Sequence, residues 1–209
     1  MTRLVVMDVD STLITQEVIE LIAERAGTRA EVAAVTEAAM RGEIDFAESL
    51  RQRVATLAGV PDTVFADVLA EVELTPGVTE LIAGLQERGC EVALVSGGFV
   101  EVVAHLATRL GITRFRANSL EVSDGRLTGR TLGPVIDRAA KAQALRDFAA
   151  ELGCELSETA AIGDGANDLD MMSAAGLGIA WHAKPVVQQQ ADVALNGPRL
   201  DEALEIIPR

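Results

Sequence analysis

"VVMDVDSTLI", residues 5–14, begins as an uninterrupted apolar run and then places Asp8 and Asp10 on either side of a single valine. Short apolar runs of this kind are typical of strands that are buried on both faces of a parallel sheet. We therefore predict a strand over residues 4–9, with two carboxylates at its carboxyl end. Buried carboxylates are costly unless other groups compensate them, so this strand end is the first candidate functional position.

The rest of the chain divides into two patterns. Residues 15–74 contain four successive segments with apolar residues at helical spacing, such as "TQEVIELIAERAG" (15–27), and no strand pattern between them. After Pro76-Gly77, strand and helix patterns alternate to the C-terminus, which is typical of βα units. The sequence predicts an α/β protein with a doubly wound parallel sheet, formed by residues 1–14 and 75–209. Residues 15–74 are predicted to be a small helical domain inserted after the first strand.

Composition restricts the possible partners. Eighteen basic and 32 acidic residues give a formal net charge of −14, which disfavours binding to nucleic acids and to anionic membranes. An anionic small molecule would need a local positive centre, such as a metal ion or a few buried cations. The N-terminus lacks the long apolar segment of a signal peptide, and no apolar run approaches the ~18 residues of a membrane span. A soluble, cytoplasmic protein is expected.

Polar groups follow three of the predicted strands. These are Asp8 and Asp10, then Ser96-Gly97-Gly98, then the segment from Asp164 to Asp168. In open α/β sheets the ligand crevice lies beyond the carboxyl ends of the strands, so these groups should converge. Two like charges 4 Å apart cost about 4 kcal/mol at an effective dielectric near 20. Four carboxylates, from Asp8, Asp10, Asp164 and Asp168, therefore predict a hard cation, and oxygen ligands favour Mg²⁺.

The same residues are suited to transfer of a phosphoryl group. One carboxylate could attack phosphorus, and a second, two residues on, could give and take the proton. Ser96, the Gly97 amide and Lys141 could bind the phosphoryl oxygens. Taken alone, an aspartate after a strand is more often a turn former, and Lys141 more often a solvated helix residue. The convergence of three strand ends favours the functional interpretation.

Together, "DVDST", "SGG", Lys141 and "GDGAND" resemble the four motifs of the haloacid dehalogenase superfamily, in the same order along the chain. The resemblance implies that Asp8 is the nucleophile, Asp10 the general acid and base, and Ser96 and Lys141 the phosphate-binding residues. It implies Mg²⁺ bound by the side chains of Asp8 and Asp164 and by the Asp10 carbonyl, with Asp168 orienting a metal-bound water. It also implies that the helical insert is a cap that selects the substrate.

Five stretches are together similar to the phosphoserine phosphatase family within that superfamily: "DVDSTLITQEVIE", "EAAMRGEIDFAESLRQRV", "LTPGV", "VSGGF" and "GDGANDLDMM". The resemblance implies that the amino-acid part of the substrate is surrounded by Glu17, Met40, Phe46, Arg53 and Asn167. Glu17 could bind an ammonium group, and Arg53 could bind a carboxylate through its planar fork. The expected reaction is Mg²⁺-dependent hydrolysis of O-phospho-L-serine to L-serine and phosphate, the last step of L-serine biosynthesis. Singly, Glu17 and Arg53 are more often surface charges, and Phe46 more often a core residue.

Two alternatives remain open. A related phosphatase or phosphotransferase could act on phosphohomoserine or on another small phosphate ester. A catalytically silent interaction protein is the alternative from another class, although the candidate nucleophile and metal-binding acid are both present. The expected partner is a small molecule, with neither nucleic acid nor membrane, and the expected assembly is a monomer or a homodimer.

Overall fold

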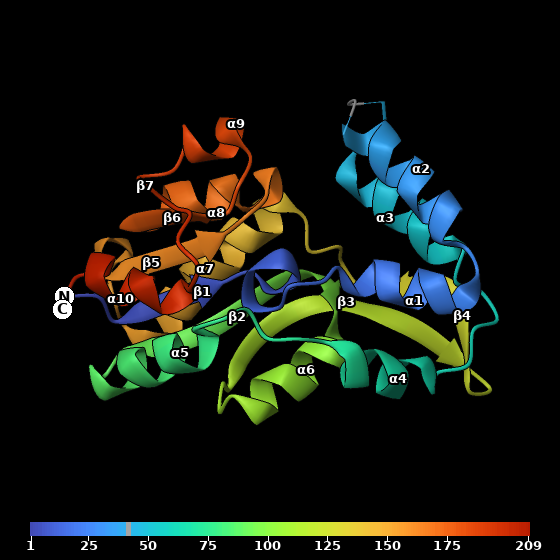
Figure 1. Cartoon of the computed structure of the whole chain (residues 1–209), viewed down its shortest axis with the longest axis horizontal. Helices are drawn as coiled ribbons and strands as arrows, with labels where there is room; N and C mark the ends of the chain where they lie inside the picture. Colours follow the sequence, from blue (N-terminus) through green and yellow to red (C-terminus); the bar gives the residue numbers. More distant parts are fainter. Residues whose placement is uncertain (41–42) are drawn as a thin grey trace.

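The computed structural model describes residues 1–40 and 43–209, without the side chain of Met40. Its centre is a seven-stranded sheet in the order β4-β3-β2-β1-β5-β6-β7, shown in Figure 1. All neighbouring strands are parallel except β4, which runs antiparallel to β3. The strands are β1 (Leu4–Met7), β2 (Glu91–Phe99), β3 (Arg114–Ser123), β4 (Arg126–Leu132), β5 (Thr159–Gly163), β6 (Leu177–Trp181) and β7 (Val193–Leu195).

The central strand β1 explains why its sequence is uniformly apolar. Its four residues are wholly inaccessible to solvent, and successive side chains point to opposite faces of the sheet. Val5 and Met7 belong to one hydrophobic core, whereas Leu4 and Val6 belong to a second core on the other face. A strand that contributes to two cores has no solvated side and therefore no polar alternation. The predicted doubly wound sheet is confirmed.

Helices cover both faces of this sheet. Helices α5 and α6 pack in the first core, and α7 and α8 pack in the second. Helix α7 begins after Asp137, whose carboxylate accepts a hydrogen bond of 2.8 Å from the amide of Ala140, and ends at Gly153 in the left-handed conformation. The helices outside the insert are α5 (Val78–Glu87), α6 (Val100–Arg109), α7 (Arg138–Leu152), α8 (Leu169–Ala174), α9 (Pro185–Gln188) and α10 (Ala203–Ile206).

The segment between β1 and α5 is helical, and we call residues 15–74 the helical insert. Its helices are α1 (Val18–Ala26), α2 (Arg29–Met40), α3 (Phe46–Ala55) and α4 (Val64–Glu71). The chain enters and leaves the insert along one short antiparallel contact, in which the Thr15 amide donates to Glu73 O and the Thr75 amide donates to Leu13 O, each at 3.0 Å. The two connections therefore lie side by side at the carboxyl end of β1.

The β3–β4 hairpin, which turns at Asp124-Gly125, also supports the insert (Figure 1). The amide of Gly59 donates to Leu127 O and the amide of Leu127 donates to Val60 O, both at 2.8 Å. The Asp62 amide donates to Gly125 O at 3.0 Å. Backbone hydrogen bonds thus join the insert to the hairpin, in addition to the two chain connections.

Two elements differ in extent between the structure and the sequence prediction. Strand β2 does not stop at Ser96 but continues to Phe99, and its register with β3 shifts between Val95 and Phe99. Over residues 199–206, where the sequence pattern predicts one last helix, the structure has a single 3-10 turn followed by the four residues of α10. Among the described residues, no helix combines the length and the apolar character that crossing a bilayer requires.

Candidate active site

A cavity of about 590 Å³ lies where the carboxyl ends of the strands meet the helical insert. Asp8, Asp10 and Asp164 line it from the core. Glu17 and Arg53 line it from the insert. The cavity therefore brings together residues that the sequence separates by more than one hundred positions.

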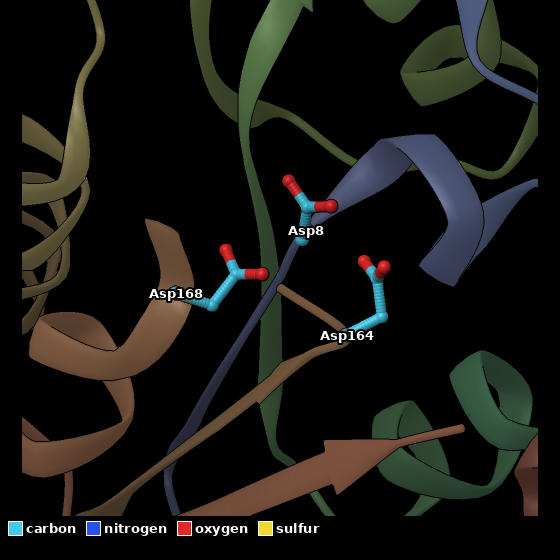
Figure 2. Close-up of side chains that lie close together, drawn as sticks. All are labelled: Asp8, Asp164 and Asp168. Carbon is cyan, nitrogen blue, oxygen red and sulfur yellow. The ribbon is translucent and has the colours of Figure 1, made fainter. Parts of the chain in front are cut away.

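Three carboxylates converge at the core side of this cavity (Figure 2). Asp8, Asp164 and Asp168 each offer an oxygen atom, and these atoms all lie within 4.8 Å of one another. Asp8 follows β1 and Asp164 follows β5. These two strands are neighbours, with Met7 opposite Ile162, so their ends coincide. A set of hard oxygen donors fits a divalent cation such as Mg²⁺. The sequence pattern groups the Asp10 carboxylate with these three, but its side chain does not belong to this cluster.

Lys141 reaches these carboxylates from α7. Its side chain is wholly buried, and Nζ donates to Asp168 Oδ1 at 2.6 Å and also to Asp8 Oδ1. Burial acts to lower the pKa of Lys141, but the carboxylates of Asp168 and Asp8 outweigh it and raise that pKa. Burial raises the pKa of Asp8 well above its ordinary value, with Lys141 opposing and Asp168 adding to the shift. Lys141 therefore places a fixed positive charge beside the carboxylates at the strand ends.

Asp10 lies on a tight turn over Val9–Leu13, in which Ser11 has a positive φ of 57°. The Asp10 carboxylate accepts a hydrogen bond of 3.3 Å from the Val18 amide. Burial, followed by repulsion from Glu17, raises the pKa of Asp10 to about 8. A carboxyl group that stays protonated near neutral pH is suited to donate a proton and later to accept one.

The "SGG" segment approaches the site closely. Gly97 lines the cavity, whereas Ser96 is wholly buried behind it and its Oγ accepts a hydrogen bond of 2.8 Å from the Gly98 amide. A Cβ atom on Gly98 would lie 2.5 Å from Asp10 Oδ2, so any larger residue there would displace the Asp10 carboxylate. The segment thus packs directly against the candidate acid and base.

The insert places an acidic and a cationic side chain in the same cavity. Glu17 accepts a hydrogen bond of 2.6 Å from Ser11 Oγ, and burial raises its pKa. Arg53 is half-buried, with Nε donating to Ser49 O at 3.3 Å. Burial lowers its pKa while Glu17 and Asp10 oppose that shift. An acid and a guanidinium in one cavity are complementary to a zwitterion, which carries an ammonium and a carboxylate.

Phe46 and Asn167 also line this cavity. An added Cβ on Gly97 would lie 3.0 Å from Phe46 Cζ, so the ring lies against the "SGG" segment. The predicted contact at Met40 concerns a side chain outside the described part of the chain. Most of the predicted substrate residues are therefore brought together in one place.

Sequence reasoning missed several residues of the site. Thr12 Oγ1 donates to Asp164 Oδ1 at 3.1 Å and so orients one of the three clustered carboxylates. Arg138 and Lys184 line the cavity as two further cations. Lys184 follows strand β6, so the rule that ligands bind beyond strand ends could have indicated it. The sequence does not distinguish it from an ordinary loop lysine.

Comparison with known proteins agrees with this geometry. A family model described as haloacid dehalogenase-like hydrolase matches residues 5–173. The chain belongs to this family. The matched range contains the three clustered carboxylates, which follow β1 and β5, and Lys141, which reaches them from α7.

Individual members of the family are also similar to this chain. The phosphoserine phosphatase SerB2 of Mycobacterium tuberculosis is 54% identical over 205 residues, which cover 98% of this chain and 50% of that protein. The phosphoserine phosphatase of Streptococcus thermophilus is 51% identical over 204 residues, with 98% and 95% covered. This chain thus spans about half the length of the first relative and nearly all of the second.

Solved structures show the same fold. A structure described as a phospho-aspartyl intermediate analogue of phosphoserine phosphatase superposes with a TM-score of 0.93. It is 40% identical to this chain, and the match covers 99% of each. The match extends over nearly the whole chain, so the two proteins share one fold.

Proposed function

We propose that this protein hydrolyses O-phospho-L-serine to L-serine and phosphate with the help of Mg²⁺. The observation that carries the proposal is the meeting of two groups of residues in one cavity. The strand-end carboxylates supply phosphoryl chemistry, and Glu17 and Arg53 supply complementary charges for an amino acid. The names of the similar enzymes support the same substrate. The reaction would be the last step of L-serine biosynthesis.

In the first half of the reaction, an Asp8 oxygen attacks phosphorus, forming an aspartyl-phosphate, while the bond from phosphorus to the serine oxygen breaks. Asp10 gives its proton to that serine oxygen, so serine leaves as a neutral alcohol. In the second half, water attacks phosphorus, Asp10 takes a proton from that water, and the bond from phosphorus to Asp8 breaks. Phosphate leaves, and both aspartates return to their starting states.

The remaining residues hold the phosphoryl group and the metal. Lys141, Ser96 and the Gly97 amide bind phosphoryl oxygens. Asp8 and Asp164 are the side chains that would hold Mg²⁺, with the Asp10 carbonyl beside them and Asp168 orienting a bound water. When bound, the cation offsets the negative charge on the phosphoryl oxygens.

The helical insert, residues 15–74, acts as a cap over a core made of residues 1–14 and 75–209. Glu17 binds the substrate ammonium and Arg53 its carboxylate. Phe46, Met40 and Asn167 complete the surroundings of the amino acid. We further propose that the protein works in the cytoplasm on a small molecule, as a monomer or a homodimer.

Phosphate release from a panel of phosphate esters tests the proposal. The panel contains O-phospho-L-serine, O-phospho-L-threonine, O-phospho-L-homoserine and p-nitrophenyl phosphate, each assayed with Mg²⁺ and with EDTA. We expect the highest kcat/KM for phosphoserine and no release with EDTA. Asp8→Asn keeps the shape of the side chain and should abolish release while the protein remains folded. A higher kcat/KM for phosphohomoserine would identify the alternative substrate, and a fully active Asp8→Asn would overturn the covalent mechanism.

A further inference from the structure

Lysine is rare in this chain: one lysine lines the cavity, and the other is buried behind it in contact with Asp8. Eighteen residues are Lys or Arg, and only Lys141 and Lys184 are lysines. Lys141 is buried against Asp8 and Asp168, while Lys184 lines the same cavity with its side chain exposed. Lysine carries a compact, hydrated charge on a flexible stem, whereas arginine forms fixed planar contacts. The two positions therefore combine a fixed charge inside the site with a flexible charge at its edge.

The backbone of Lys184 is held firmly at that edge. The residue lies between β6 and α9, and Pro185 follows it. Its carbonyl accepts hydrogen bonds from the amides of Val187 and Gln188, at 2.9 and 3.1 Å. These hydrogen bonds fix the Cα atom of Lys184 beside the cavity, while its long side chain is exposed to solvent.

Lys184 differs from the other cations of the cavity in its surroundings. Arg138 forms an ion pair with Asp170, with Nη2 and Oδ1 2.5 Å apart. The charge of Arg53 interacts with those of Glu17 and Asp10. Within residues 1–40 and 43–209, Lys184 has no ion-pair partner. Its charge is therefore available to an incoming anion.

A positive charge at this position would offset the repulsion between an acidic protein and an anionic substrate. The chain carries a formal net charge of −14, and four of the residues that line the cavity are acidic. Phosphoserine carries roughly one and a half to two negative charges on its phosphate near neutral pH. The negative electrostatic potential of the protein repels this substrate. A cation at the entrance can raise the rate at which the substrate enters the cavity.

We propose that Lys184 receives the phosphate group of the incoming ester at the mouth of the cavity and guides it toward Lys141 and Asp8. This inference rests on the proposed function and adds to it a residue that determines affinity for the anion. Lys184 recognises the phosphate group of the substrate. The amino-acid part is left to Glu17 and Arg53, which already supply charges complementary to it.

Three variants test this role in the full chain with Mg²⁺. Lys184→Gln removes the charge, and Lys184→Arg retains it. Arg109→Gln removes one charge from α6, on the opposite face of the sheet (Figure 1), where Arg109 is exposed and does not line the cavity. The measured quantities are kcat, KM, the inhibition constant for inorganic phosphate, and the dependence of kcat/KM on ionic strength.

We expect Lys184→Gln to raise KM for phosphoserine roughly threefold to tenfold and to change kcat by less than about twofold, because steering acts on encounter. The inhibition constant for inorganic phosphate should rise by the same factor, and kcat/KM should depend less on salt. Lys184→Arg should restore most of the affinity, and Arg109→Gln should resemble the unchanged protein. Equal behaviour of Lys184→Gln and Arg109→Gln would overturn the inference. A rise in KM without a rise in the phosphate inhibition constant would also overturn it.

Direct binding of inorganic phosphate, measured by calorimetry, separates this inference from the proposed function. If the unchanged protein releases no phosphate from phosphoserine, the proposed substrate is wrong. Weaker phosphate binding in Lys184→Gln than in Arg109→Gln would still support the role of Lys184. Equal binding in those two variants would refute it.

Discussion

Lys141 and Asp168 form an ion pair in which both side chains are wholly inaccessible to solvent, with Nζ and Oδ1 2.6 Å apart. Lys141 lies in the first turn of α7, and Asp168 immediately precedes α8. The second oxygen of Asp168 accepts a hydrogen bond of 3.0 Å from the Gly165 amide. The pair therefore fixes the loop after β5 against α7, and through Asp8 it also fixes the end of β1.

Lys141→Met should destabilise the protein strongly. It leaves Asp8 and Asp168 buried without a cation, and breaking a buried pair from one side typically costs about 3–5 kcal/mol. Urea unfolding at pH 7.5 in EDTA measures the free energy of unfolding. The double variant Lys141→Met with Asp168→Asn should recover part of the loss, because one uncompensated charge is then removed. A loss below about 1 kcal/mol for Lys141→Met would show that water already compensates these carboxylates.

The metal-free protein should lose stability as the pH rises. The pKa of Asp10 is raised to about 8 and that of Asp164 to about 6, in both cases chiefly by burial, from an ordinary value near 3.8. The folded state then binds more protons than the unfolded state between about pH 4 and 8. The free energy of unfolding must therefore fall across this window and level off above it. Carboxylates near the surface with lowered pKa values, such as Glu48 and Glu80, act near and below their ordinary value of 4.5, at the acid end of this window.

Urea unfolding in EDTA from pH 5.5 to 8.5 measures this dependence. Asp164→Asn should flatten the part of the curve below about pH 6, since that carboxyl no longer titrates. Mg²⁺ should stabilise the protein more at pH 8 than at pH 6, because the ligands must be deprotonated before they bind metal. Stability that increases between pH 6 and 8 in EDTA would contradict the assigned direction of these pKa shifts.

The sequence predicts the core and the convergence of Asp8 with Asp164 for a physical reason. The residues of β1 are apolar without interruption because they face two cores, and this is visible in the sequence. Asp8 and Asp164 each follow a buried strand directly, so their convergence needs only that the two strands be neighbours. Hydrophobic patterns do not encode strand order, so the sequence alone does not place β1 beside β5.

Other parts of the site depend on contacts that leave no local pattern. The hydrogen bonds between residues 59–62 and the hairpin join backbone groups, which every residue type possesses. The cavity position of Lys184 depends on the path of the chain after β6, and its place after a strand does not distinguish it from an ordinary loop lysine. The buried position of Ser96, with its hydroxyl directed to the Gly98 amide, follows from the extension of β2 to Phe99.

Arg53→Ala should weaken the binding of phosphoserine but not that of esters without a carboxylate. A hydrogen-bonded charge contributes about 1.5–3 kcal/mol, so we expect KM for phosphoserine to rise roughly tenfold to a hundredfold. The KM for p-nitrophenyl phosphate should change little, since this ester has no carboxylate. Arg51→Ala is the matched control, because Arg51 lies on the same helix but is exposed and paired with Glu48 at 2.7 Å. Equal losses for both esters would remove Arg53 from recognition of the amino acid.

Two glycines of the hairpin test whether it positions the helical insert. Gly125 and Gly129 both have positive φ values, of 71° and 83°, so alanine strains the backbone at each by about 1–2 kcal/mol. Only at Gly129 would the new Cβ also meet α3 and the turn that follows it, at 3.0 Å from Ala58 Cβ and 3.2 Å from Ala55 O. At Gly125 the nearest of the surrounding atoms is 4.0 Å away. The difference between the two variants therefore isolates the contact between hairpin and insert.

Gly129→Ala should lower the free energy of unfolding by about 1–3 kcal/mol more than Gly125→Ala, because the added methyl overpacks this contact. It should also raise KM for phosphoserine, since α3 carries Phe46 and Arg53 into the cavity. Gly125→Ala should leave KM unchanged. Urea unfolding and steady-state kinetics measure the two effects separately. If both variants lost equal stability and kept the same KM, the insert would hold its place over the strand ends without the hairpin, through its paired connections at Ile14 and Leu74 alone.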